Sequence, residues 1–118
     1  MYSLSDQRLS ALLKSGRQQA IRGSLTGLEK ESLRVGPDGS IAQTPHPAAL
    51  GSALTHPWIT TDYSEALLEF ITPPLGSPDE ALAFLRDLQQ FVYLKLDQEL
   101  LWSSSMPCVV EGGASIPI

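Results

Sequence analysis

The sequence contains a single cysteine, Cys108, so no internal disulfide can form. The first residues also lack the basic stretch and apolar core of a secretory signal. Both absences suit a reducing compartment, and we expect a cytoplasmic protein. Neither of the two histidines stands at a recognisable catalytic spacing from Cys108, which is therefore predicted to be a buried structural thiol rather than a nucleophile.

Long hydrophobic runs and basic clusters are missing as well. No apolar stretch approaches the roughly 20 residues that a bilayer requires, so we expect no membrane partner. Eight basic residues stand against 13 acidic ones, for a net charge of -5, and no run of Lys or Arg suits a phosphate backbone. We therefore expect no nucleic-acid partner. A hydrophobic content of 42% over 118 residues instead predicts one folded domain.

Hydrophobic periodicity predicts two helices. Leu9, Leu12 and Leu13 recur at helical spacing and predict a helix over residues 5–20, which Gly16 weakens near its end. The motif SPDE at residues 77–80 combines an N-cap serine, a proline at the first helical position and a capping-box glutamate. A helix is therefore predicted from residue 78 to about residue 101.

Two segments are predicted to be strands. Alternation over LEKESLRV, residues 28–35, and the turn sequence PDG that follows favour a strand. The segment YSEALLEFIT, residues 63–72, has both helix-favouring and strand-favouring residues. Its shortness and the two prolines that end it favour a strand.

Acidic residues fall on unexpected faces of these strands. Glu29 and Glu31 share a face with Leu33 and Val35, which places two acids on an apolar side. An ionised carboxylate removed from water costs several kcal/mol unless a cation compensates it, and a bound divalent ion would do so. The alternative is a solvated strand face, so these residues alone indicate a candidate hard-metal site and name no reaction.

The second strand repeats the pattern. Glu69 lies between Leu67 and Ile71 on one face. Asp62 stands an odd number of residues from Glu69 and would face away on an ideal strand. We therefore expect Asp62 to reach the same site only from the strand entrance or from an irregular turn.

Three blocks of sequence resemble the N-terminal region of proteobacterial glutamate-cysteine ligases: GLEKESLRV, HPAALGSALTHPWITTDYSEALLEFITP and SMPC. The resemblance runs from Gly27 to Cys108. It implies an α+β fold that is part of a glutamine-synthetase-like cradle, in which helices cover a curved, mostly antiparallel sheet. It also implies that residues 1–118 are a single N-terminal fragment of a larger ligase catalytic domain.

The resemblance further implies a site and a reaction. The matching metal ligands are Glu29, Glu31, Glu69 and Asp62, and Tyr63 matches a position beside the cysteine substrate. The implied cofactor is Mg²⁺ or Mn²⁺, with ATP as co-substrate. The γ-carboxylate of L-glutamate attacks the γ-phosphate of ATP, and the amine of L-cysteine intercepts the acyl phosphate, which is the first step of glutathione biosynthesis.

Two further expectations and two alternatives accompany this interpretation. The fragment alone is predicted to be inactive, and apolar residues of its second helix are predicted to promote self-association. One alternative is a noncatalytic interaction or regulatory module on the same scaffold. Another is a related ligase that joins glutamate to a different amine.

Overall fold

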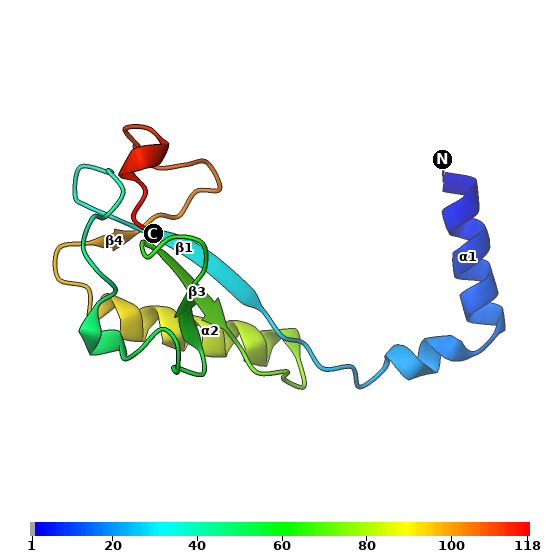
Figure 1. Ribbon diagram of the computed structural model, residues 1–118. Coiled ribbons are helices and arrows are strands. Elements are labelled where there is room, and N and C mark those ends of the chain that lie inside the picture. The colour runs from blue at the N-terminus through cyan, green and yellow to red at the C-terminus, as the bar shows by residue number, and fades with distance from the viewer. Residues whose placement is uncertain (1) are drawn as a thin grey trace.

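The computed structural model describes residues 2–118, which form an α+β body and a helical arm that projects from it (Figure 1). The arm consists of α1 (Tyr2–Lys14) and a 3₁₀ turn, η1 (Arg17–Ile21). The elements of the body follow in chain order: β1 (Glu29–Val35), η2 (Ala48–Leu50), β2 (Ile59–Thr61), β3 (Leu67–Ile71), α2 (Pro78–Tyr93), β4 (Leu100–Leu101) and η3 (Gly113–Ser115).

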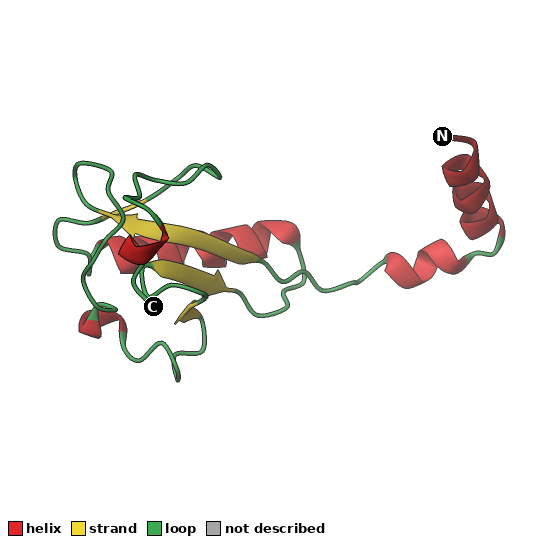
Figure 2. Cartoon of the chain, turned by 45° about the horizontal axis from the view of Figure 1, so that its top comes forward, coloured by secondary structure: helices red, strands yellow, loops and turns green. Residues whose placement is uncertain are grey.

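The four strands form one sheet in the order β2-β3-β1-β4, and every neighbouring pair is antiparallel. Helix α2 lies along one face of this sheet (Figure 2). The predicted strand over residues 28–35 is confirmed as β1, which occupies the centre of the sheet beside β3. The α+β architecture with an antiparallel sheet and a covering helix is likewise confirmed.

The strand predicted over residues 63–72 is partly wrong, because the segment holds a turn followed by the shorter strand β3. The Ser64 hydroxyl accepts a hydrogen bond from the Ala66 backbone N–H at 3.1 Å, and the Ser64 carbonyl accepts one from Leu67 N–H at 2.8 Å. These local bonds satisfy the backbone of the turn. The chain thereby reverses between β2 and β3, and the two strands pair as a hairpin.

Helix α2 begins as predicted, with the Ser77 hydroxyl accepting the Glu80 backbone N–H at 3.2 Å. Its buried face packs Leu85, Leu88 and Val92 onto the sheet residues of the main core. The helix ends at Tyr93, not near residue 101, because the following segment returns to the sheet and pairs with β1 as β4. The predicted length was therefore too great.

The arm differs from the single helix predicted over residues 5–20. Gly16 adopts a left-handed conformation (φ 71°), which other residues rarely adopt, and the helix stops before it. No residue of α1 is buried, and the arm accounts for the elongated shape of 55 × 31 × 22 Å. No helix within residues 2–118 is both long enough and apolar enough to span a bilayer.

Arg34, a residue of β1, is fully buried and contacts three other segments. Its guanidinium forms an ion pair with Glu99 at 2.6 Å (Nη1 to Oε2) and donates to the Thr44 hydroxyl and carbonyl, each at 2.7 Å. It also donates to the Glu65 carbonyl at 3.2 Å. One side chain thus links the centre of the sheet to the segments that precede β2, β3 and β4.

Candidate metal-binding face

The register of the sheet brings the acidic residues of β1 and β3 together. Glu31 lies directly opposite Glu69, and Glu29 lies opposite Ile71, one diagonal step from Glu69. Cross-strand neighbours have Cβ atoms about 5 Å apart. The intervening residues Leu68 and Phe70 pack under α2, so the three carboxylates occupy the opposite face of the sheet, which α2 leaves uncovered.

Asp62 joins this face from the turn that follows β2, which is the route that the sequence analysis left open. The odd spacing from Glu69 does not place it on the other face, because a turn separates β2 from β3. Thr60 pairs with Glu69, and the Asp62 backbone N–H donates to the Leu67 carbonyl at 3.2 Å. Asp62 therefore continues the ladder two residues beyond Thr60 and belongs to the same side as Glu69.

The acids do not lie in an apolar interior, so the expectation of carboxylates removed from water is wrong, and the alternative of a solvated face describes Glu29 and Glu31. Glu29 and Glu31 are exposed, whereas Glu69 is partly buried. Only the far end of this face is apolar, where Val35 packs with the C-terminal segment around Cys108, which is buried as predicted. The near end, which carries the acids, is open.

Partial burial and the crowding of like charges raise the pKa of Glu69 above the ordinary carboxyl value. The largest cause is partial burial of the Glu69 carboxyl, followed by the negative charges of Glu29, Asp62 and Glu31. The four side chains therefore share one electrostatic environment. Their mutual repulsion favours any cation that can sit among them.

This pKa shift predicts that the charge on Glu69 destabilises the fold. The pKa of Glu69 is raised in the folded protein. Folding therefore becomes less favourable as the pH rises from about 4.3, the ordinary pKa of Glu, through the pKa of Glu69 in the folded state. Glu69→Gln should raise the free energy of unfolding at pH 7 by roughly 0.5 kcal/mol, the size of a cross-strand charge effect, and the gain should vanish below about pH 4. Urea unfolding at both pH values measures it. The exposed variant Glu111→Gln is the control, and an equal gain there would contradict the prediction.

The donor set fits a hard divalent cation. Across residues 2–118, no three Asp, Glu, His or Cys side chains lie close enough to hold one ion by themselves. Magnesium, however, is typically bound by one or two carboxylates together with water and substrate phosphates, rather than by a cage of protein ligands. The opposed pair Glu31 and Glu69 supplies two such carboxylates, and Glu29 and Asp62 stand beside them.

Tyr63, the predicted substrate contact, lies in the turn that follows Asp62. Its side chain is 69% exposed. The turn is formed by the hairpin of β2 and β3, so Tyr63 lies at the end of the acidic face nearest Leu67. Its role beside a substrate stays a prediction.

A recess of about 390 Å³ opens beside Glu31, and sequence reasoning missed it. Its floor is the cross-strand pair Leu33 and Leu67, and its wall is the loop that follows Trp102. The indole N–H of Trp102 donates to the Met106 carbonyl at 2.6 Å and fixes that loop. No periodic pattern in the sequence signals such a recess, because its two sides come from distant segments.

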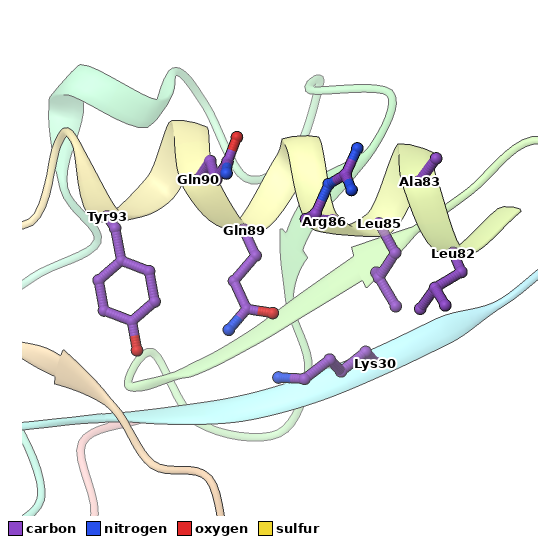
Figure 3. Close-up of a pocket in the computed structure, with 8 residues that line it drawn as sticks. All are labelled: Lys30, Leu82, Ala83, Leu85, Arg86, Gln89, Gln90 and Tyr93. Carbon is purple, nitrogen blue, oxygen red and sulfur yellow. The ribbon is translucent and has the colours of Figure 1, made fainter. Parts of the chain in front are cut away.

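A larger pocket, of about 590 Å³, lies on the other side of the sheet between β1 and α2. Lys30 of β1 borders it, and four side chains of α2 point toward β1 there (Figure 3): Leu82, Leu85, Gln89 and Tyr93. Burial lowers the pKa of Lys30, whose ammonium lies 5.6 Å from the ring centre of Phe70. Lys30 and Phe70 belong to the face opposite the acids, so this pocket is separate from the carboxylate group.

Comparison with known proteins identifies the family of this chain. Residues 9–118 match the glutamate-cysteine ligase family. The chain is 52% identical over 113 residues to a glutamate-cysteine ligase of Alcanivorax borkumensis, covering 96% of this chain and 22% of that protein. It is 53% identical over 118 residues to the glutamate-cysteine ligase of Azotobacter vinelandii, covering 100% of this chain and 22% of that protein.

Two solved structures share the fold. One is the glutamate-cysteine ligase of Francisella tularensis in complex with AMP, with a TM-score of 0.70 and 42% identity over 72% of this chain and 17% of that one. The other is a bifunctional glutathione synthetase from Pasteurella multocida, with a TM-score of 0.79 and 34% identity over 89% of this chain and 15% of that one. The fold is thus one found in ligases. The chain belongs to the glutamate-cysteine ligase family and spans about 22% of the length of the curated relatives it matches.

Proposed function

We propose that residues 1–118 are the N-terminal part of the catalytic domain of an ATP-dependent glutamate-cysteine ligase. The enzyme would join the γ-carboxylate of L-glutamate to the amine of L-cysteine through an acyl phosphate. One observation carries this proposal: Glu31 and Glu69 oppose each other, with Glu29 and Asp62, on one open sheet face of a chain that matches the family over residues 9–118.

The four acids act in this proposal as metal anchors and not as nucleophiles. Bound Mg²⁺ would neutralise crowded phosphate oxygens and align the γ-phosphate with the attacking carboxylate. The opposed residues Glu31 and Glu69 would hold it together with Glu29 and Asp62 beside them. The AMP bound by the Francisella tularensis relative supports a nucleotide as co-substrate, and Tyr63 is proposed to lie beside the cysteine substrate.

The direct test is product analysis with the complete protein. We expect γ-glutamylcysteine, ADP and inorganic phosphate to form in equal amounts, and only with Mg²⁺ or Mn²⁺ present. Release of AMP and pyrophosphate would contradict the acyl-phosphate route. A preference for another amine in an acceptor screen would favour the related-ligase alternative, and absence of any product would favour a regulatory module.

The isolated 118-residue chain is predicted to form no product, because it spans about 22% of the length of related ligases. It should also bind Mg²⁺ weakly, since two carboxylates without phosphates provide few ligands. Assays of ligation and of Mg²⁺ binding by calorimetry check both statements. Sustained product formation by the purified chain would contradict the first.

Self-association through exposed apolar residues such as Leu82 and Leu94 stays a prediction that sedimentation velocity tests.

A further inference from the structure

The turn between β2 and β3 carries two of the proposed site residues, Asp62 and Tyr63, and both are exposed. The Asp62 backbone N–H donates to the Leu67 carbonyl at 3.2 Å, a bond that stays within the hairpin. Exposed turns move more readily than the strands they connect. The contacts of the neighbouring residues in the turn therefore decide where Asp62 and Tyr63 lie relative to the other acids.

Glu65 makes these contacts, and each of its polar groups binds a different segment. Its carboxylate oxygen Oε1 accepts the His46 backbone N–H at 3.0 Å, in the loop between β1 and η2. Its backbone N–H donates to the Pro117 carbonyl at 3.1 Å, near the C-terminus. Its carbonyl accepts the Arg34 guanidinium of β1 at 3.2 Å. One residue thereby joins the turn to three segments that are distant in the sequence.

The side chain of Glu65 can be tested separately from its backbone. Ser64, which is buried, also donates its hydroxyl to the Pro117 carbonyl, at 2.7 Å. This bond and the two backbone bonds of Glu65 do not involve the Glu65 carboxylate. A substitution of Glu65 therefore removes the contact with His46 and leaves groups in place that hold the turn to the C-terminal segment and to β1.

The Glu65 carboxylate does not belong to the acidic face. The negative charges that raise the pKa of Glu69 are those of Glu29, Asp62 and Glu31, and Glu65 is not among them. What Glu65 supplies to His46 is an acceptor oxygen, which an amide side chain also has. A charged acceptor forms the stronger bond, so an amide should keep most of the effect and an alanine none of it.

We propose that Glu65 is a positioning residue of the ligation reaction. By accepting the His46 backbone N–H, its carboxylate fixes the turn so that Asp62 stays with the metal-binding acids and Tyr63 stays beside the cysteine substrate. Glu65 itself touches neither the metal nor a substrate. This inference rests on the proposed function, because the roles of Asp62 and Tyr63 belong to that function.

The kinetic test uses the complete protein. Glu65→Ala should raise the Michaelis constant for cysteine and the Mg²⁺ concentration for half-maximal rate about tenfold each, the scale of one hydrogen bond to a charged acceptor. The kcat at saturation should stay within about threefold, because the groups that act in the reaction remain. Glu65→Gln should bring both constants back to within about threefold of the unchanged protein. Glu111→Ala, which removes an exposed acid elsewhere, is the matched control and should alter neither.

Hydrogen exchange tests the same contact without metal or substrate. In the metal-free complete protein, the backbone amides of His46 and Asp62 should exchange about tenfold faster in Glu65→Ala, since the first loses its acceptor and the second lies in the released turn. Glu65→Gln should exchange at nearly the unchanged rate. The amides of β1 and β3 should keep their rates in both variants.

The outcomes separate the inference from the proposed function. Equal losses in Glu65→Ala and Glu65→Gln would show that the charge matters and not the acceptor, and would overturn the inference. Faster exchange without a change in either constant, or faster exchange throughout the sheet, would reduce Glu65 to a structural role and overturn it as well. If the unchanged complete protein forms no γ-glutamylcysteine, the proposed function fails. Hydrogen exchange then still decides whether Glu65 holds the turn.

Discussion

Glu69→Gln in the complete protein is expected, under the proposed function, to lower kcat by at least about 100-fold, the scale found when a group that stabilises charge in the transition state is removed. Glu69 is the central member of the acidic face, since it opposes Glu31 and senses the charges of Glu29 and Asp62. An amide keeps the shape of the side chain but binds magnesium poorly. Steady-state kinetics at several Mg²⁺ concentrations measure the loss.

The same substitution should leave the fold intact or slightly stabilised, so loss of activity cannot be attributed to unfolding. Glu31→Gln should give a loss of similar size, because Glu31 is the other half of the opposed pair. Glu111→Gln removes an exposed acid elsewhere in the chain and should leave kcat within about twofold, as surface substitutions usually have small effects. Near-normal turnover by either Glu69→Gln or Glu31→Gln would refute the assigned roles.

Arg34→Met is expected to lower the free energy of unfolding by about 3–5 kcal/mol, the usual range when one partner of a buried ion pair is removed. Without the guanidinium, the partly buried Glu99 carboxylate loses its cation, and the carbonyls of Thr44 and Glu65 lose their donor. A loss of that size is a large part of the total stability of a small domain. Urea unfolding followed by circular dichroism measures it.

Arg86→Met is the matched control for this change. Arg86 lies on the exposed side of α2, where its 3.6 Å contact with Asp87 joins two side chains that are each about two-thirds exposed. Such an exposed pair contributes at most about 1 kcal/mol. Equal midpoints for Arg34→Met and the unchanged protein would show that the ion pair with Glu99 does not hold the segments together.

The central strand could be predicted from the sequence because its alternation is strong and local. The same holds for the start of α2, where Ser77 and Glu80 lie three residues apart and their hydrogen bond is decided by neighbours in sequence. The carboxylates of β1 could be assigned to one face for the same reason. These features depend only on residues close together in the chain.

The other features of the fold and of the candidate site depend on contacts between segments that are distant in the sequence. The side to which Asp62 belongs is decided by the register of β2 against β3, which no count along the chain reveals once a turn intervenes. The end of α2 depends on the pairing of the following segment with β1 as β4, and the recess beside Glu31 depends on where Trp102 holds its loop. The predicted interior position of the acids failed because apolar neighbours covered only one end of the face.

Alternate residues of β1 point to opposite faces of the sheet. Glu31 belongs to the acidic face, whereas Ser32 and Arg34 are buried on the opposite side. A slip of one position relative to β3 would send Glu31 beneath α2 and bring Arg34 out among the acids. The ion pair with Glu99 resists such a slip, so the residue that links these segments also maintains the register that gathers the acids on one face.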